Sequence, residues 1–278
     1  MLFIVNPISG KGRKKRLISL LKESGYEVAC TEFAGHAEIL ARETSAKTVI
    51  AVGGDGTVNE VARGLIGTGK TLGIIPCGSG DGLARHLGLS HHPGKALKTI
   101  LAGKTAAIDA GNIDGRMFFS ICGVGFDAVV SERFAKCGKR GLSSYIKEGL
   151  KTWKIYSPEK YYIRIDSDEF EHEAMFVSVG NSNQWGNGAK ITPLADISDG
   201  MLDITVVDRF KVYEIPWLAG RLMCGSVHKS QRVHTYRGQH ITITRPAESP
   251  AHADGDWFIA GKNLEIRIIP QALNVLIP

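Results

Sequence analysis

The sequence contains no long hydrophobic run, and this absence excludes a membrane-spanning helix. None of its apolar stretches approaches the roughly 18 residues that a span needs. The N-terminal MLFIV is followed by an Asn-Pro turn, so the apolar start is too short for a signal peptide. We therefore expect a soluble, cytoplasmic protein.

Cysteine is scarce, and its arrangement excludes a disulfide framework and a structural zinc site. The five cysteines are scattered, none forms a C-x-x-C pair, and no histidine or cysteine group has zinc-ligand spacing. The nine histidines show no ligand spacing either, and most of them are expected at the surface. This cysteine usage is typical of a reducing compartment.

Charge of one sign is only in small excess. The formal net charge of +6 favours anionic partners such as nucleotides, nucleic acid or an acidic membrane surface, without choosing among them. Nucleic acid is not expected, because no aromatic-basic platform or known nucleic-acid-binding module is present. The 278 residues are enough for one large domain or two modest ones.

The first hundred or so residues alternate between strand-like and helix-like patterns. Buried strands are expected near residues 2–5, 26–33, 48–52 and 71–76, with helices between them. One such helix should bury Leu17, Leu20 and Leu21, and another should bury a face made of Val58, Val61, Ala62 and Leu65. The alternation predicts right-handed crossovers and a doubly wound, mostly parallel sheet.

After Thr105 the pattern changes to short β-like runs punctuated by Asp-Gly turn signals. Two helix-like segments, 131–153 and 211–223, interrupt these runs. We predict an α/β domain over 1–105 and a C-terminal antiparallel β-sandwich domain over 106–278. The pattern does not fix the boundary between the two domains to one residue, and it leaves open that the final segment packs on the first domain.

Three predicted strands end in glycine-rich polar loops: NPISGKG (6–12), GGDGT (53–57) and PCGSGDG (76–82). In a doubly wound sheet these loops lie at the same edge, where ligands bind. Glycine lets several backbone N–H groups approach one anion, which predicts a phosphate site. The loops are not a Walker motif, because G-x-x-x-x-G-K-[ST] is absent, and GVGFDA (123–128) is a poor dinucleotide fingerprint.

Asp55 is a single carboxylate within this expected phosphate cradle. It would repel a phosphate unless a cation lay between them, so Mg²⁺ is the natural bridging ion. The alternative is that Asp55 simply caps the helix that begins near Thr57.

The motifs NPISG, VGGDGTVNEVARGL, PCGSGDGLAR, GFDA, GNSNQWGNGAKITPLADISDGMLDI and ADGD occur in the order seen in the diacylglycerol kinase catalytic-domain family. The chain resembles this family nearly from end to end. The resemblance implies a two-domain kinase that binds ATP and Mg²⁺ and phosphorylates a lipid hydroxyl, with a fold shared with NAD kinases. The first domain would hold the nucleotide and the second the lipid acceptor.

The resemblance also implies roles for individual residues. Those expected to line the nucleotide are Asn6, Gly54, Asp55, Gly56, Thr57, Glu60, Gly78, Ser79 and Asp256. The second loop reads Ser79-Gly80-Asp81 where the family usually has Thr-x-Asn-Asp, and Asp256 stands where the family usually has Glu. Asp254 matches the position of the family's proposed general base, with Asp55 as the other catalytic candidate.

The segment PLADISDGMLD offers a second metal hypothesis. Asp196, Asp199 and the carbonyl of Met201 resemble the family's structural Mg²⁺ loop, and hard oxygen donors suit that ion. The alternative is a plain Asp-Gly hairpin turn that needs no metal.

The segment from Arg133 to Lys154 contains seven basic residues and a single acidic residue, Glu148. The apolar positions with helical spacing in this segment are Leu142, Tyr145, Ile146, Leu150 and Trp153. A basic amphipathic helix of this kind can lie on an anionic membrane, whereas the alternative is ordinary packing on the core. The run KGRKKR (11–16) is interpreted as a solvated helix start, with a phosphate contact as its alternative.

The sequence therefore predicts an ATP-dependent lipid kinase associated peripherally with the inner face of the membrane. Its partners would be ATP and a membrane-presented lipid, with a homodimer left open. Two alternatives stay open: a kinase of the same fold with a soluble acceptor such as NAD, and a catalytically silent nucleotide or lipid sensor.

Overall fold

The computed structural model describes residues 1–7, 14–137 and 142–278. They form two compact units, Met1–Asp109 with Pro270–Pro278 (unit 1) and Ala110–Ile269 (unit 2). The chain passes from unit 1 to unit 2 within strand β5 (Thr105–Ile113) and returns within strand β17 (Asn263–Leu276).

Unit 1 is built on a parallel sheet with the strand order β2-β1-β3-β4-β17. Its strands are β1 (Leu2–Val5), β2 (Glu27–Cys30), β3 (Thr48–Gly53) and β4 (Thr71–Pro76), and the end of β17 pairs with β4. The central strand β3 is fully buried from Val49 to Gly53, because a parallel sheet is covered on its faces. This burial explains its uninterrupted apolar sequence.

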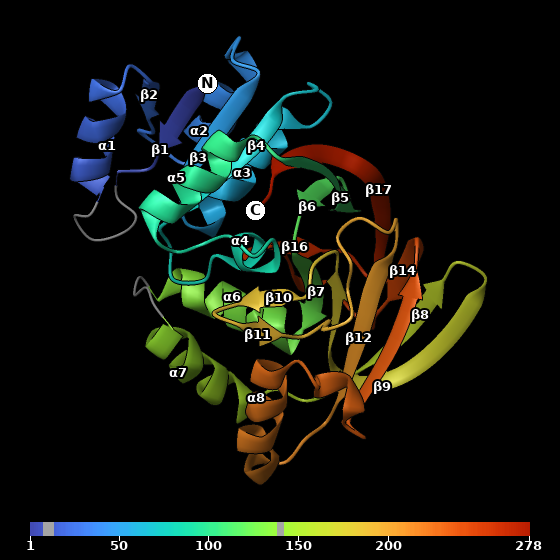
Figure 1. Ribbon diagram of the computed structural model, residues 1–278. Helices are drawn as coiled ribbons and strands as arrows, with labels where there is room; N and C mark the ends of the chain where they lie inside the picture. Colours follow the sequence, from blue (N-terminus) through green and yellow to red (C-terminus); the bar gives the residue numbers. More distant parts are fainter. Residues whose placement is uncertain (8–13, 138–141) are drawn as a thin grey trace. The chain divides into compact units, whose positions relative to one another are not determined.

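Three helices connect successive strands from β1 to β4 (Figure 1): α1 (Lys14–Glu23), α2 (His36–Glu43) and α3 (Asp55–Leu65). Helices α4 (Gly82–His86) and α5 (Pro93–Ala102) lie between β4 and β5 in the chain. The predicted face of α3 is confirmed, since all four of its apolar residues are at most 4% exposed. The prediction for α1 was wrong in one residue: Leu21 is buried, whereas Leu20 is 50% exposed. Adjacent helical residues point about 100° apart, so both cannot lie on one narrow buried face.

Unit 2 is an antiparallel β-sandwich in which the long strand β9 (Asp168–Gly180) is shared by two arrays of strands. Its first half pairs with β8 (Glu159–Ile165). Its second half lies between β7 (Ile121–Gly125) and β12 (Leu202–Asp208). Strand β13 (Val233–Gly238) follows β12, and β14 (His240–Thr244) joins β8 to β17.

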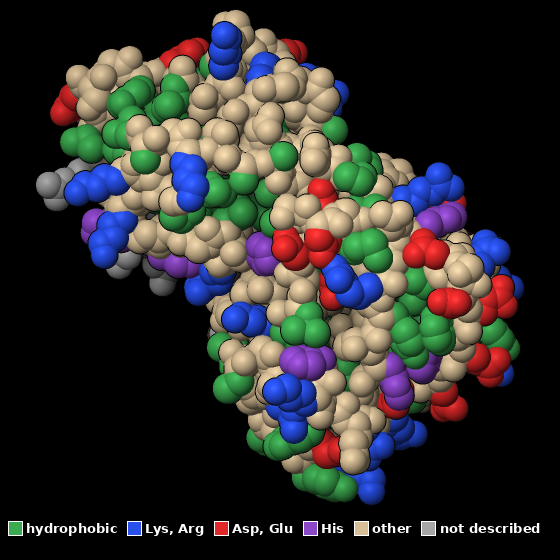
Figure 2. Space-filling view, turned by 45° about the vertical axis from the view of Figure 1, so that its right-hand side comes forward, with side chains coloured by type: hydrophobic (Ala, Val, Ile, Leu, Met, Phe, Trp, Pro, Cys, Tyr) green, Lys and Arg blue, Asp and Glu red, His purple; other side chains and the backbone are tan. Residues whose placement is uncertain are grey.

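The remaining strands of unit 2 are β6 (Arg116–Phe118), β10 (Gln184–Gly186), β11 (Ala189–Lys190), β15 (Ser249–Ala253) and β16 (Asp256–Ala260). Its helices are α6 (Phe126–Lys136), α7 (Leu142–Trp153) and α8 (Ile215–Cys224), with short 3₁₀ turns η1 (Val212–Glu214) and η2 (Val227–Lys229). One core of buried aliphatic and aromatic side chains fills the sandwich. Figure 2 shows acidic, basic and histidine side chains interspersed over the face that it presents.

Candidate nucleotide, acceptor and metal sites

The second and third glycine loops follow β3 and β4 in unit 1 and contact each other through their backbones. A Cβ atom added at Gly54 would lie 3.1 Å from the Cα of Gly78, and one added at Gly78 would lie 2.7 Å from the Cα of Gly54. Side chains at these two positions would therefore push the loops apart. The exposed residues at this edge are Gly56, Gly78 and Ser79.

Asp55 is the first residue of α3, and its carboxylate joins the two loops. Its Oδ2 accepts a hydrogen bond from the Asp81 N–H at 2.8 Å, and its Oδ1 accepts one from the Gly82 N–H at 2.6 Å. The side chain thus holds the start of α4 and does not cap α3, whose N-cap is Gly54. The simple helix-cap alternative is replaced by a contact between loops.

Asp81 is a second carboxylate at the same place, and the sequence did not single it out as a site residue. It is 2% exposed, its backbone is left-handed with φ 47°, and its Oδ1 accepts the Gly78 N–H at 3.0 Å. Its Oδ2 lies 3.2 Å from Nδ1 of His91. Burial, and then the charge of Asp55, raise the pKa of Asp81 above its ordinary value.

This carboxylate pair has the donor chemistry of a magnesium site. Both groups supply hard oxygen atoms, and their mutual repulsion would be relieved by a divalent cation. Asp55 and Asp81 are the residues of unit 1 that could hold Mg²⁺ beside a phosphate.

The other predicted nucleotide residues of unit 1 are held in different ways. Thr57 is buried in the first turn of α3, and Asn6 follows β1 with its N–H on the Val52 carbonyl at 3.2 Å. The Glu60 carboxylate accepts the Ala37 N–H at 3.1 Å, so it contacts the start of α2. Most of the first glycine loop, and the basic run 11–16 with its predicted phosphate contact, lie outside the residues and side chains described here.

In unit 2, Asp254 occupies the turn between β15 and β16. Asp254 and Gly255 have φ values of 51° and 87°, the pattern of a two-residue type I′ hairpin. The carboxylate accepts three backbone N–H groups at 2.8–2.9 Å, from Phe119, Ser120 and Ile121. Asp254 therefore orders the connection between β6 and β7 as well as its own turn.

A buried polar cluster lies beneath this turn and was missed by the sequence-based interpretation. His252 is 4% exposed, and its Nε2 lies 3.1 Å from Oδ2 of the buried Asp127. The Ser178 hydroxyl donates to the same oxygen at 3.0 Å, and Nδ1 of His252 accepts the Gly255 N–H at 3.4 Å. His252 is therefore an exception to the expectation that most histidines lie at the surface. Asp256, the other predicted residue of this hairpin, is exposed at the start of β16.

The predicted metal loop is a turn in which Asp199 already faces a positive charge. Oδ1 of Asp199 accepts the Met201 N–H at 3.0 Å, and Oδ2 is paired with the Arg237 guanidinium. Oδ1 of Asp196 accepts the N–H and the hydroxyl of Ser198. The oxygen donors suit Mg²⁺, but binding through Asp199 requires Arg237 to move away.

Arg237 also lies 3.3 Å from Asp203, which lines a pocket of about 250 Å³ next to this loop. Burial, opposed by Arg237, raises the pKa of Asp203 to about 6. The Arg237 guanidinium is therefore paired with two carboxylates, those of Asp199 and Asp203.

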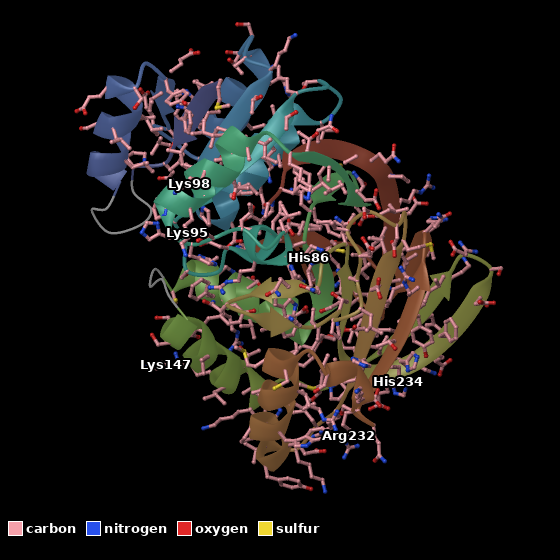
Figure 3. The ribbon with its side chains drawn as sticks, in the orientation of Figure 1. His86, Lys95, Lys98, Lys147, Arg232 and His234 are labelled. Atoms are coloured by element: carbon pink, nitrogen blue, oxygen red, sulfur yellow. The ribbon has the colours of Figure 1, made fainter. Side chains whose placement is uncertain are left out.

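The predicted amphipathic stripe of α7 divides into packed and exposed side chains. Trp153 is partly buried against a second apolar cluster of unit 2, which includes Phe176 and Val207. Tyr145 is 38% exposed, and its ring contacts Phe134 edge-on at a centroid distance of 5.4 Å. Ile146 and Leu150 are 51% and 46% exposed. The basic residues Lys147, Lys151 and Lys154, which we call the α7 lysines, are exposed as well, and Figure 3 labels Lys147 on this helix.

A second exposed apolar and basic group, not anticipated from the sequence, occupies η1 and α8. Tyr213 and Trp217 are 70% and 48% exposed. Lys211 lies over the Tyr213 ring at 5.7 Å and Arg221 over the Trp217 ring at 4.0 Å. None of the described helices is both long and apolar enough to cross a membrane.

Solved structures of a diacylglycerol kinase and an NAD kinase share the fold of this chain. A diacylglycerol kinase from Bacillus anthracis aligns over 100% of this chain and 96% of its own, with a TM-score of 0.77 at 20% identity. An NAD kinase from Archaeoglobus fulgidus, solved in complex with ATP, aligns over 99% and 92% with a TM-score of 0.56 at 13% identity. These alignments cover both the parallel sheet of unit 1 and the β-sandwich of unit 2.

Sequence comparisons identify the family. Residues 1–113 match the diacylglycerol kinase catalytic domain, and residues 120–277 match the YegS C-terminal NAD kinase beta sandwich-like domain. A "Probable lipid kinase YegS-like" of Citrobacter koseri is 30% identical over 98% of this chain and 94% of its own length. A "Probable lipid kinase YegS" of Escherichia coli is 30% identical over 95% and 91%. The chain belongs to the diacylglycerol kinase catalytic-domain family of lipid kinases.

Proposed function

We propose that this protein is an ATP-dependent lipid kinase that transfers the γ-phosphate of ATP to a lipid hydroxyl. The observation that carries the proposal is the carboxylate pair Asp55 and Asp81, held by two glycine loops in backbone contact. Carboxylates of this kind suit a divalent cation, and glycine loops suit the phosphates that such a cation accompanies. Membership of a lipid kinase family supports the reaction class.

In this proposal the nucleotide binds at the loops of unit 1. Gly54, Gly56 and Thr57 lie at the N-terminus of α3, where the backbone N–H groups and the helix dipole favour an anion. Bound Mg²⁺ would supply positive charge between the carboxylates and the phosphate oxygens, which is most of what phosphoryl transfer requires. The further contacts in the proposal are Asn6, Gly78, Ser79 and Asp256.

Glu60 has a supporting role in the proposal, because its carboxylate bonds the Ala37 N–H. That hydrogen bond ties α3 to α2 and so helps to fix the position of the loop in front of α3.

We propose that Asp254 is the general base that accepts the proton of the lipid hydroxyl. A lipid hydroxyl is a weak nucleophile, and a positioned carboxylate accelerates its reaction by roughly 10²–10⁴-fold. The three backbone N–H groups on Asp254 fix its orientation, which favours positioned proton transfer. Since these amides also give Asp254 a structural role, the two roles have to be separated experimentally.

The lipid is proposed to be reached by peripheral docking of unit 2 on an anionic membrane. Ile146 and Leu150 on α7 and Tyr213 and Trp217 on η1 and α8 offer apolar and interfacial side chains, and the α7 lysines offer positive charge. The two regions are linked, because Trp153 at the end of α7 contacts Phe210 at a centroid distance of 6.5 Å.

An acceptor panel tests this function against its alternatives. The purified protein is incubated with ATP, Mg²⁺ and, separately, diacylglycerol, phosphatidylglycerol, a sphingoid base and NAD. Transfer to one of the lipids supports the proposal, and transfer to NAD alone replaces it with the soluble-acceptor kinase. Binding of ATP without transfer to any acceptor would favour the silent sensor.

A structural Mg²⁺ at Asp196 and Asp199 is a separate proposal, and it requires Arg237 to be displaced.

A further inference from the structure

Three side chains with metal-ligating chemistry meet on one face of unit 2, and none of them has been given a role above. They are His172 on β9, Asp208 at the end of β12 and His234 on β13. In the antiparallel register Val206 pairs with His234, and Asp208 pairs with Ala174. Alternate residues of a strand share a face, so His172 lies on the same face of β9 as Ala174. The register between β12 and β9 shifts between Val207 and Asp208, and the ligand atoms of the three side chains converge at this irregularity.

The distances between their ligand atoms are close to those of a metal centre. One nitrogen of each histidine and one oxygen of Asp208 all lie within 4.8 Å of one another, and Nε2 of His234 is 2.9 Å from Oδ2 of Asp208. Ligands about 2.0–2.2 Å from a tetrahedral Zn²⁺ lie roughly 3.3–3.6 Å apart. To complete the geometry, separations near 4.8 Å shorten by about 1 Å and the 2.9 Å separation between His234 and Asp208 lengthens, and small side-chain rotations achieve both changes.

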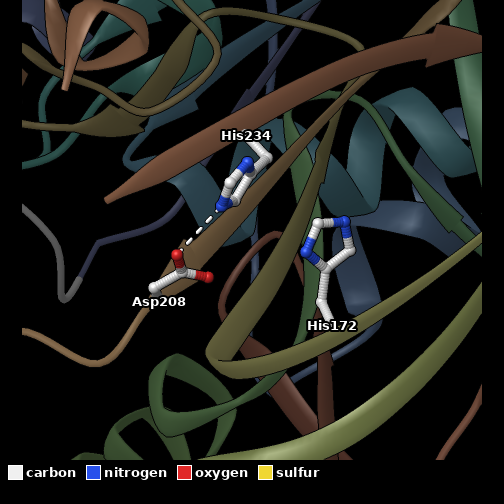
Figure 4. A group of neighbouring side chains, drawn as sticks. All are labelled: His172, Asp208 and His234. Carbon is white, nitrogen blue, oxygen red and sulfur yellow. Dashed lines mark hydrogen bonds and ion pairs between the residues drawn. The ribbon is translucent and has the colours of Figure 1, made fainter. Parts of the chain in front are cut away.

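The histidine rings are already oriented for this task. Figure 4 shows both imidazoles directed toward the Asp208 carboxylate, with one nitrogen of His172 on that side. Nε2 of His172 bonds the Tyr236 hydroxyl at 2.8 Å, which leaves Nδ1 as its ligand atom. A hydrogen bond on the second ring nitrogen is the usual way in which a metal-ligating histidine is held in place.

The cluster is open to solvent, and an ion bound there would replace the proton that lies between Nε2 of His234 and Oδ2 of Asp208. The side chains of Asp208 and His234 are 30% and 40% exposed.

We propose that His172, Asp208 and His234 form a binding site for a divalent transition metal of the Zn²⁺ class. Two imidazole nitrogens and one carboxylate oxygen suit Zn²⁺, Co²⁺ or Ni²⁺ better than Mg²⁺, which prefers oxygen alone. Three protein ligands leave a fourth position for water. The bound ion ties β9 to β13 across β12, so it stabilises the sandwich and takes no part in phosphoryl transfer.

Isothermal titration of the full-length, chelator-treated protein with Zn²⁺ tests the proposal. Cys30 and Cys224 are exposed thiols that bind Zn²⁺ non-specifically, so both are replaced by serine in every sample. We expect one Zn²⁺ per chain, and at least a tenfold loss of affinity in His172→Asn and in Asp208→Asn. His240→Gln is the matched control, because His240 pairs with Glu265 at 2.8 Å on the same unit without a second histidine.

Co²⁺ provides a readout of geometry that is independent of affinity. Co²⁺ bound by the protein should show the intense visible absorption of a tetrahedral complex, and this band should be lost in Asp208→Asn and kept in His240→Gln. The proposal is overturned if Zn²⁺ affinity is the same in the His172, Asp208 and His240 variants, or if no stoichiometric binding is detected. The three residues would then form a hydrogen-bonded cluster only.

Discussion

Replacing Asp254 with asparagine separates the two roles that the structure and the family suggest for this carboxylate. The carboxamide can keep its oxygen at the position of Oδ1, where it accepts the Ser120 and Ile121 N–H groups. The Phe119 N–H loses its hydrogen bond and points at the NH₂ group of the asparagine, which is also a donor. This should lower the free energy of unfolding by about 1–3 kcal/mol.

The loss of a general base has a different signature. Turnover should fall by roughly 10²–10⁴-fold, while ATP affinity stays nearly unchanged, because Asp254 is not among the residues assigned to the nucleotide. Asp256→Asn should cost less turnover than Asp254→Asn. Activity, the dissociation constant for ATP and denaturant unfolding are measured on the same preparations, at a temperature at which each variant is folded.

Asp114→Asn is the matched control for the turn. Asp114 and Gly115 form the same left-handed pair, with φ values of 46° and 85°, and Asp114 accepts the Glu265 N–H at 2.8 Å. This variant should lose a small amount of stability and keep its turnover. Near-normal turnover with equal ATP affinity in Asp254→Asn would refute the assignment of the base and transfer that role to Asp55.

Three further predictions concern the nucleotide loops and the membrane surface. Asp55→Asn should abolish turnover while circular dichroism shows a persisting fold, and retained Mg²⁺-dependent activity would contradict its role. Gly78→Ala should weaken ATP binding in an equilibrium assay, because the added Cβ would lie 2.7 Å from the Cα of Gly54. Gly94→Ala is the control and should not weaken binding, because its Cβ would lie 3.4 Å from the nearest atom, Cε1 of His92. Equal weakening by both variants would argue against loop contact as the cause. Changing the three α7 lysines to glutamate should reduce the fraction of protein that sediments with anionic vesicles, most clearly at low salt. Each replaced lysine should weaken the binding free energy by on the order of 1 kcal/mol. Unchanged sedimentation would leave α7 as an ordinary packing helix.

The repeated pattern of unit 1 could be predicted because buried parallel strands need continuous apolar runs. Strand β3 and the buried face of α3 follow directly from TVIAV and from the spacing of four apolar residues. Helix α5 was missed although Pro93 and Gly103 mark its first residue and its C-terminal cap. Strand β15, with the sequence SPAHA, has no β-branched residue and exists because it pairs with β7 and β16.

The candidate site was predictable only as far as strand ends determine it. Parallel topology predicts that the glycine loops meet at one edge, but not that Asp55 bonds the amides of Asp81 and Gly82. The histidine cluster could not be found from spacing, because His172 and His234 meet only through their strands' pairing with β12. Contacts of this kind depend on register and on loop conformation, neither of which a linear motif encodes.

Transfer of labelled γ-phosphate from ATP to a total cell lipid extract tests the central claim most directly. The wild-type protein and the Asp55→Asn variant are incubated with the extract and Mg²⁺, and the lipid phase is separated and its labelled product identified. The proposed function predicts a phosphorylated lipid with the wild-type protein and no label with the variant. Absence of lipid label from a folded wild-type protein that binds ATP, or equal label with both proteins, would contradict it.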